Sequence, residues 1–269
     1  MRRFEYARPS TLAEAVALLA QEGERAKVLA GGTDLLIRLR DRTLGPAVVV
    51  DIKRIPEIAP AITQDGALVR ISAGTTMTTL VESDLLRRSF PALVEAARYV
   101  GSVQIRNRAT LAGNQCNASP AADTATPLLV YGAVVVATGS GGERRISLDE
   151  FFVRSGVTTL EVGELVTAIE LPLPSGARRS AFQRRTRRRG HDLASVTVSV
   201  VLADDGVRLA YGSLGPRPRL IVGGPGSAEE LLERAVSEAS PSPTSMRAGP
   251  EYRLAMLRVL GKRAIEAAA

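Results

Sequence analysis

The sequence predicts an α+β protein of about two domains, and three observations support this class. The chain has 269 residues, which is long for a single hydrophobic core. Residues 1–57 alternate helix and strand patterns, and the rest of the chain changes to strands separated by turn residues, with two helices at its end. Pro172–Gly176 is the best candidate for a domain boundary. We therefore expect a first region over 1–175, with a second subdomain at about 58–175, and a small C-terminal α+β domain with an antiparallel sheet over 177–269.

Charge and composition narrow the class of function. The chain carries 35 Lys and Arg against 28 Asp and Glu, and its net charge of +7 would suit nucleic acid, an acidic partner or an acidic cofactor. The only lysines are Lys27, Lys53 and Lys262. Such a preference for arginine often reflects genome composition or heat tolerance. Aromatic residues are 4% of the chain and tryptophan is absent, which argues against base-stacking surfaces. We therefore expect no binding of nucleic acid.

Sequence features also bear on location and metal content. No apolar run reaches the ~18–20 residues of a membrane span, and Met1–Pro9 has no apolar signal core. The single cysteine, Cys116, excludes an internal disulfide. It also excludes an iron–sulfur or zinc site made from cysteines of this chain, because such sites need about four ligands. These features predict a cytoplasmic protein without a membrane span.

The first subdomain is expected to alternate helices and strands. Thr11–Glu14 has the composition of a capping box before a helix, and Lys27–Ala30 is typical of a short buried strand. That strand continues into Gly31-Gly32, and a helix over Leu36–Arg40 follows. Ala47–Ile52 is a second apolar strand.

The middle of the chain combines strands and helices. Ile62–Gly74 predicts strands broken by a turn at Asp65-Gly66. The remaining elements expected here are helices over Leu80–Arg88 and Ala92–Val100, and strands over Ala133–Ala137 and Glu164–Leu171.

The C-terminal third begins with an arginine-dense stretch between Arg178 and Arg189. Such a stretch is usually a solvated face, and here it could also neutralise phosphates or dock an acidic partner. Ser195–Leu202 alternates apolar and small polar residues, which predicts a strand with one buried face. A hairpin turn follows at Asp204–Gly206, and the final elements are helices over Ala228–Ala239 and Tyr252–Ala267.

The segment Arg106–Thr126 is too polar and too small to belong to a core. Ser119 is a good N-cap and Pro120 a good first helical residue, so we expect a helix to begin there. Its free N–H groups would face the loop at Gly113–Asn117 and would suit a phosphate or an electron-rich ring edge. The alternative is an ordinary loop before an ordinary helix.

The loop at Gly31-Gly32 has related chemistry. A strand that ends in two glycines and opens a helix lets backbone N–H groups approach a pyrophosphate closely. The loop lacks the G-x-G-x-x-G spacing of a dinucleotide fingerprint and the Gly-Lys-Ser/Thr of a P-loop. Alone it is a weak signal that favours a plain tight turn over a phosphate site.

Together the two loops resemble a known family. A-G-G-T-D-L at Ala30–Leu35 and A-T-L-A-G-N-x-x-N-A-S-P-A-A-D at Ala109–Asp123 are similar to motifs of the FAD-binding medium subunits of molybdenum hydroxylases, the xanthine dehydrogenase and aerobic carbon monoxide dehydrogenase family. Further matches cover nearly the whole chain and lie at Phe4–Ala15, Val50–Glu57, Val100–Arg108, Glu164–Pro172 and Arg188–Val196. The resemblance implies a two-subdomain FAD-binding region of the vanillyl-alcohol-oxidase (PCMH) type before the C-terminal domain.

The resemblance also implies site residues. The loops that hold the FAD pyrophosphate and ribityl chain correspond to Val28, Leu29, Ala30, Gly31, Gly32, Thr33, Asp34 and Leu35, and to Thr110, Gly113 and Asn114. Hydrogen bonds to the cofactor are implied for Asn117, Ser119 and Asp123, and packing against it for Val100 and Leu165. Arg184 matches a position beside the isoalloxazine that is commonly lysine, and Asp192 matches the acidic residue of the same segment.

Several positions depart from the family or have competing interpretations. Ala112 stands where the motif has a glycine, so the backbone there must have φ below zero or be strained. Leu193 lies near a position that is aromatic in some relatives, and leucine would cover the ring without stacking. His191, the only histidine, is expected at the cofactor or the surface rather than as a general base. Cys116 is expected to be a small loop residue rather than a redox thiol. Asp123 could also cap its own helix.

The function implied by the resemblance is electron transfer within a three-subunit complex. Electrons would leave a substrate at a molybdopterin cofactor on a large subunit, pass two [2Fe–2S] clusters on a small subunit, reach FAD here and continue to an external acceptor. A dimer of such heterotrimers is expected. The alternatives are a stand-alone FAD-dependent oxidase or reductase and a cofactor-free RNA-binding or scaffold protein. The sequence leaves the substrate and the electron acceptor open.

Overall fold

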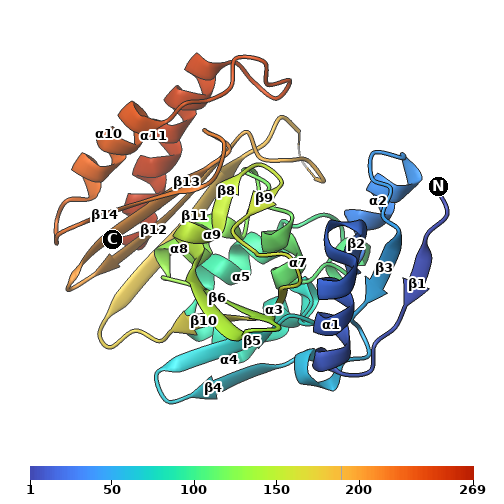
Figure 1. Ribbon diagram of the computed structural model, residues 1–269. Coiled ribbons are helices and arrows are strands. Elements are labelled where there is room, and N and C mark those ends of the chain that lie inside the picture. The colour runs from blue at the N-terminus through green and yellow to red at the C-terminus, as the bar shows by residue number, and fades with distance from the viewer. Residues whose placement is uncertain (189) are drawn as a thin grey trace.

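Three larger sheets and a two-stranded one, β8–β9, make up the strands of the molecule (Figure 1). The computed structural model describes residues 1–188 and 190–269, so Arg189 of the arginine-dense stretch lies outside the described residues. A three-stranded sheet at the N-terminus is followed by a five-stranded sheet in the middle and a four-stranded sheet near the C-terminus. Helices and strands occur in every part, which confirms the predicted α+β class with antiparallel sheets.

The N-terminal sheet is parallel and has the strand order β1–β3–β2. Its elements are β1 (Glu5–Ala7), α1 (Leu12–Glu22), the 3-10 turn η1 (Gly23–Arg25), β2 (Ala26–Leu29), α2 (Leu35–Arg40) and β3 (Val48–Asp51). The hydroxyl of Thr11 accepts a hydrogen bond from the Glu14 N–H at 3.2 Å, as predicted for the cap of α1. The Glu14 carboxylate reaches one residue further back and accepts from the Ser10 N–H at 2.7 Å.

The middle sheet is antiparallel and has the order β4–β5–β10–β6–β7. Its central strand β10 is buried along its whole length except its last residue, because strands flank it on both edges and packed side chains cover it. The strands and their small neighbouring elements are η2 (Pro56–Ile58), β4 (Ile62–Asp65), β5 (Leu68–Ser72), β6 (Val134–Gly139), β7 (Gly142–Ser147), α9 (Leu148–Phe151), β8 (Phe152–Arg154), β9 (Val157–Thr158) and β10 (Leu165–Pro172).

Six short helices lie in the sequence between β5 and β6: α3 (Met77–Glu82), α4 (Asp84–Ser89), α5 (Pro91–Arg98), α6 (Val103–Arg106), α7 (Leu111–Cys116) and α8 (Ala125–Val130). The predicted single helix over 80–88 is wrong. Ser83 has extended backbone angles, and its hydroxyl accepts from the Leu86 N–H at 3.3 Å. Ser83 therefore ends α3 and caps α4.

The predicted helix start at Ser119-Pro120 is also wrong, since α7 lies before these residues and α8 begins at Ala125. The Pro120 carbonyl accepts a hydrogen bond of 2.6 Å from the N–H of Ser213, which follows a C-terminal strand. A contact with a distant part of the chain thus holds residues 119–124 outside a helix, although the local sequence favours one.

The C-terminal sheet is antiparallel in the order β11–β12–β13–β14, and two helices cover its outer face (Figure 1). Its elements are β11 (Arg178–Arg185), β12 (Val196–Ala203), β13 (Gly206–Gly212), β14 (Arg219–Gly223), α10 (Ala228–Glu238) and α11 (Pro250–Ala268). The expected single buried face of β12 is wrong, because Thr197 and Ser199 are fully buried as well. The Ser199 hydroxyl donates to Thr126 of α8 at 2.9 Å, so the inner face packs on the middle of the molecule.

Two kinds of feature are absent from the residues that the structure describes. None of their helices is both long and apolar enough to cross a membrane. Within the same residues, no group of three or more His, Cys, Asp or Glu side chains is placed to hold a metal ion.

Candidate functional site

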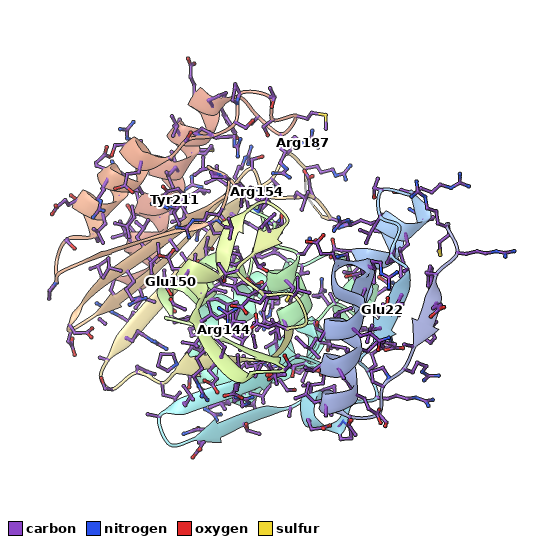
Figure 2. The ribbon with its side chains drawn as sticks, viewed as in Figure 1. Glu22, Arg144, Glu150, Arg154, Arg187 and Tyr211 are labelled. Atoms are coloured by element: carbon purple, nitrogen blue, oxygen red, sulfur yellow. The ribbon has the colours of Figure 1, made fainter. Side chains whose placement is uncertain are left out.

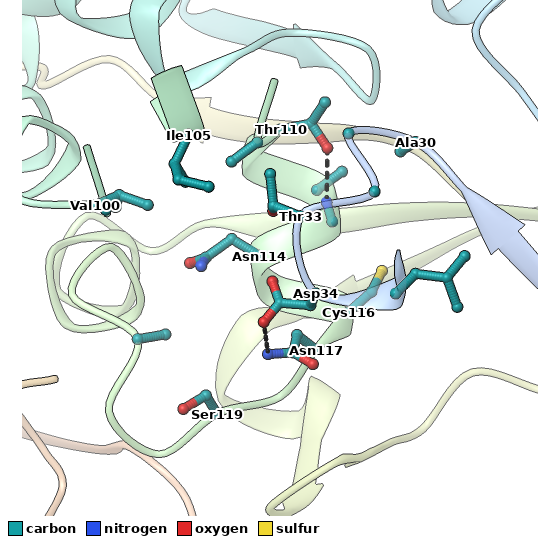
Figure 3. Close-up of a pocket in the computed structure, with 18 of the residues that line it drawn as sticks. Ala30, Thr33, Asp34, Val100, Ile105, Thr110, Asn114, Cys116, Asn117 and Ser119 are labelled. Carbon is teal, nitrogen blue, oxygen red and sulfur yellow. Dashed lines mark hydrogen bonds between the residues drawn. The ribbon is translucent and has the colours of Figure 1, made fainter. Parts of the chain in front are cut away.

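A cavity of about 460 Å³ lies where the three parts of the chain meet, and Figure 3 shows it in close-up. Its walls come from the loop after β2, from α7 and the residues after it, from the beginning of β10, and from residues 191–193. Sixteen of the eighteen residues implied by the resemblance line it, the exceptions being Leu29 and Arg184. Segments that are distant in sequence therefore meet at one cavity.

The glycine loop after β2 forms one wall through a very close backbone contact. A Cβ atom on Gly31 would overlap the carbonyl oxygen of Arg108 and would stand 2.8 Å from the carbonyl carbon. Gly32 has φ of +78°, a conformation that side chains rarely adopt. Both glycines are thus required by the geometry of the loop.

The second loop motif is a short helix in the structure. Thr110 is the N-cap of α7, and its hydroxyl accepts from the Gly113 N–H at 3.1 Å (Figure 3). Ala112 lies inside α7 and is not among the non-glycine residues with positive φ. The departure from the motif is therefore accommodated without strain, because a helical backbone accepts alanine at least as well as glycine.

Partly buried hydrogen bonds orient Asn114 at the cavity wall. Its side-chain carbonyl accepts from the Thr124 hydroxyl at 2.7 Å and from the Gln115 amide at 3.2 Å. The Gln115 amide also donates to Thr124 at 2.8 Å. The carbonyl end of Asn114 is thereby used within the protein, which leaves its amide group as the part available to a ligand.

One side-chain hydrogen bond joins the two loops directly. The amide of Asn117 donates to the carboxylate of Asp34 at 3.3 Å (Figure 3). Next to it, Ala118 is buried with φ of +45°, an uncommon conformation for a residue other than glycine. The Ser119 hydroxyl accepts from the Ala121 N–H at 3.3 Å and so caps a turn instead of a helix. These contacts define the wall that faces the glycine loop.

A buried ion pair lies at the end of the cavity near the C-terminal sheet. The Asp123 carboxylate and the Arg184 guanidinium approach to 3.3 Å, both side chains are 9% exposed, and neither of the facing atoms makes a hydrogen bond within the described chain. Burial raises the pKa of Asp123 to about 7, although the charge of Arg184 acts in the opposite direction. Asp123 therefore changes its charge near neutral pH.

Arg184 lies behind the cavity wall and contacts three of its residues. Besides Asp123, it donates to the Asp192 carbonyl at 2.7 Å and to the Tyr99 carbonyl at 3.4 Å. Its guanidinium carbon lies 4.9 Å from the centre of the Tyr99 ring, which lines the cavity. The arginine therefore holds the C-terminal sheet against this wall.

Asp192 keeps its charge, while the side chain beside it is exposed. Burial would raise the pKa of Asp192, but hydrogen bonds from the Arg188 and Arg187 N–H groups and the charges of both arginines lower it overall. Leu193 is 54% exposed and lines the cavity together with His191. Burial raises the pKa of Cys116, which also lines the cavity, to about 12, so that thiol stays protonated at neutral pH.

The structure adds lining residues that sequence reasoning did not select, among them Lys27, Arg38, Tyr99, Ile105, Leu160 and Glu164. Tyr99 and Glu164 directly precede the selected residues Val100 and Leu165, so proximity in sequence was a usable signal. Lys27 and Arg38 make no ion pair within the described chain, whereas Glu164 is held by Arg144. These two cations are thus available to pair with an anionic group of a ligand.

Comparison with known proteins agrees with this geometry. The family model for the FAD binding domain in molybdopterin dehydrogenase matches residues 2–174. The medium chain of carbon monoxide dehydrogenase from Afipia carboxidovorans is 33% identical over 98% of this chain and 96% of its own length. A putative xanthine dehydrogenase FAD-binding subunit of Escherichia coli is 33% identical over 98% of this chain and 95% of its own.

Solved structures are similar over the same extent. A chain of carbon monoxide dehydrogenase from Hydrogenophaga pseudoflava, in a form that lacks the Mo-pyranopterin moiety of its molybdenum cofactor, matches with a TM-score of 0.92. The two chains are 30% identical, and the match covers 99% of this chain and 97% of that one. The similarity therefore includes the C-terminal sheet as well as the region that carries the cavity.

Proposed function

Because this chain belongs to the FAD-binding medium subunits of the molybdenum hydroxylases, which are oxidoreductases, we propose that it is the electron-transferring flavoprotein subunit of such a complex. The observation that carries the proposal is the cavity between the glycine loop and α7. Both loop motifs line it, together with six charged residues and apolar residues such as Val100 and Leu165. FAD, when bound, supplies the redox chemistry, and this chain binds and orients it.

The residues present fit FAD in their chemistry. The glycine loop packs against Arg108 and lines the cavity beside α7, where main-chain N–H groups of such a loop can bind a pyrophosphate. Asp123 has a buried oxygen without a hydrogen-bond partner in the described chain, a position that a cofactor group could satisfy. The amide of Asn114 and the hydroxyl of Ser119 supply further polar contacts, and Val100 and Leu165 supply apolar ones.

The proposal assigns a separate role to each end of the cavity. Arg184, Asp123 and Asp192 would lie near the isoalloxazine and set the charge around it, with Leu193 covering the exposed side. Residues Val28 to Leu35 with Thr110 and Gly113 would hold the pyrophosphate and ribityl chain. We also propose the division of the chain into residues 1–175 and a C-terminal domain, whose packing against each other would exclude water from these contacts.

The remaining centres of the proposed complex lie on other chains. This chain has a single cysteine, so the two [2Fe–2S] clusters belong to a small subunit and the molybdopterin cofactor to a large one. Electrons would arrive from the clusters and leave to an external acceptor. We place the assembly in the cytoplasm as a dimer of heterotrimers without nucleic acid.

The test is the composition of the native protein. Purified from its source under mild conditions, it should show flavin absorbance near 450 nm and bring two further chains with iron and molybdenum. A yellow protein that carries FAD without metals or partner chains would instead indicate a stand-alone oxidase or reductase. A colourless chain that does not take up added FAD would refute the flavoprotein assignment altogether.

A further inference from the structure

The turn between β9 and β10, residues 159–164, forms part of the cavity wall. Leu160 and Glu164 line the cavity, and so does Leu165, which follows directly in β10. Turns of this kind have few main-chain bonds of their own, and the Glu164 N–H to Glu161 carbonyl bond of 3.1 Å is a short-range one. The shape of this wall therefore depends on what holds the turn from outside.

Arg144 of β7 is the residue that holds it. Its Nε and Nη2 atoms donate to the two carboxylate oxygens of Glu164 at 2.8 and 2.6 Å, a two-point ion pair. Nη2 also donates to the Thr159 carbonyl at 2.9 Å, at the other end of the turn. Figure 2 labels Arg144 at the five-stranded sheet, in the middle of the view. One guanidinium thus joins both ends of the turn to that sheet.

Two further contacts complete the arrangement. The Glu164 carboxylate accepts from the Glu161 N–H at 2.7 Å, so the ion pair is tied to the centre of the turn as well. Gly163 has φ of +89°, and a Cβ atom there would stand 3.1 Å from the Cα of Ala20 in α1. The turn is therefore enclosed between α1 of the N-terminal subdomain and Arg144 of the middle sheet.

We propose that Arg144 is a positioning residue for the dinucleotide cofactor, which acts by fixing, through Glu164 and Thr159, the cavity wall at residues 160–165. The proposal rests on the proposed function, because it concerns FAD in this cavity. Arg144 itself does not line the cavity. Its two-point pairing keeps Glu164, whose side chain is 9% exposed, in one orientation, and so keeps Leu160 and Leu165 in place for the ligand.

The neighbouring arginine provides a matched control. Arg145 follows on the same strand, so its side chain points to the opposite face of the sheet. It also pairs with a buried glutamate, since its Nε atom lies 3.1 Å from Glu170, which Arg70 holds as well. Neither Arg145 nor Glu170 lines the cavity. A loss of charge pairing on this sheet can thus be separated from an effect on the cavity wall.

The experiment measures FAD affinity and thermal unfolding for the full chain and its variants Arg144→Ala, Arg144→Lys and Arg145→Ala. We expect Arg144→Ala to bind FAD about tenfold more weakly and to release it faster, because the charge-assisted hydrogen bonds to Glu164 and Thr159 are lost. Arg144→Lys should recover part of the affinity, since lysine keeps the charge but not the two-point geometry. Arg145→Ala should bind FAD as the unchanged protein does, even where its melting temperature falls.

The outcomes distinguish this inference from the proposed function. Equal FAD affinity for Arg144→Ala and the unchanged chain would overturn the role of Arg144 and leave the flavoprotein assignment intact. Failure of the unchanged chain to bind FAD would overturn both. If Arg144→Ala does not fold, Arg144→Lys takes its place, because it removes the two-point pairing without changing a residue that lines the cavity. Weakened FAD binding by that variant supports the proposal, and unchanged binding contradicts it.

Discussion

Gly31 lies with its main chain against the carbonyl group of Arg108, closer than any side chain at position 31 would allow. The first of these residues belongs to the loop after β2 and the second to the segment that leads into α7. Their contact brings the two loop motifs together and sets the width of the cavity between them. The hydrogen bond between Asn117 and Asp34 closes the same space from the other side.

Replacement of Gly31 by alanine should therefore separate the two walls. The added Cβ meets main-chain atoms of Arg108 that cannot rotate away, and overpacking of this kind costs about 1–3 kcal/mol. We expect a lower melting temperature and at least about tenfold weaker FAD binding, since affinity changes tenfold for each ~1.4 kcal/mol. Calorimetry and fluorescence titration measure the two effects. Gly141→Ala is the control, because a Cβ there has nothing within 4 Å, and a comparable loss in both variants would contradict the explanation.

Replacement of Ala112 by glycine tests whether the motif position needs a left-handed backbone. Ala112 is helical and buried, so glycine should lower the free energy of unfolding by roughly 0.5–1 kcal/mol and leave FAD affinity unchanged. Chemical denaturation and FAD titration of the same preparation provide the comparison. Tighter FAD binding by Ala112→Gly would show that alanine is a strained substitute at this position.

Asp123 should make the FAD-free protein less stable as the pH rises, which is the opposite of the effect of a carboxylate whose pKa is lowered by folding. Its pKa rises from 3.8 in the unfolded chain to about 7 in the folded one, so the folded state binds the extra proton between these values. Stability contributed by this group is thus present at low pH and is lost as pH rises through about 7. Asp123→Asn cannot titrate, and the difference in unfolding free energy between the unchanged protein and this variant should fall from pH 5 to pH 8. A difference that stays constant over this range would refute the assignment.

Arg184 should raise the reduction potential of bound flavin, and most strongly below pH 7. A cation near the ring stabilises the negative charge of the reduced form. At pH 6 Asp123 is largely protonated and the charge of Arg184 is uncompensated, whereas at pH 8 the pair is neutral overall. Redox titration of Arg184→Ala should therefore show a lower potential at pH 6 and a smaller change at pH 8.

The control for this prediction is the next residue on the same strand. Arg185 is exposed and donates to the hydroxyl of Tyr252 at 3.0 Å, away from the cavity. Arg185→Ala should leave the potential unchanged at both pH values. An unchanged potential in Arg184→Ala at pH 6 would remove the proposed electrostatic role of that residue.

Local chemistry made much of the fold predictable from sequence. The cap at Thr11, the two glycines after β2 and the turn before Gly206 each follow from the needs of a few adjacent residues. Sixteen of the residues proposed for the site line one cavity. They could be selected from the sequence only through the family resemblance, because local rules do not connect the two loops. Alone, each loop was also consistent with an ordinary turn.

The errors arise where distant contacts override local preference. Ser119 and Pro120 have the composition of a helix start, but the hydrogen bond from Ser213 to the Pro120 carbonyl holds them in a turn. Thr197 and Ser199 alternate with valines as exposed residues would, but α8 covers their face and Thr126 accepts the Ser199 hydroxyl. The ion pair between Arg144 and Glu164 could not be predicted either, since nothing in the sequence indicates which strand lies beside the turn at residues 159–164.

The central position of β10 also has a consequence for the order of folding. β10 separates β5 from β6, and Arg70 of β5 pairs with Glu170 of β10, 100 residues further along the chain. Strand pairing over such a distance is slow, because a long loop must close before any contact rewards it. During synthesis, the edge of β5 that faces β10 therefore stays unpaired until β10 has emerged. FAD capture, which needs Leu165 at the beginning of β10, is accordingly expected only after about two thirds of the chain has been made.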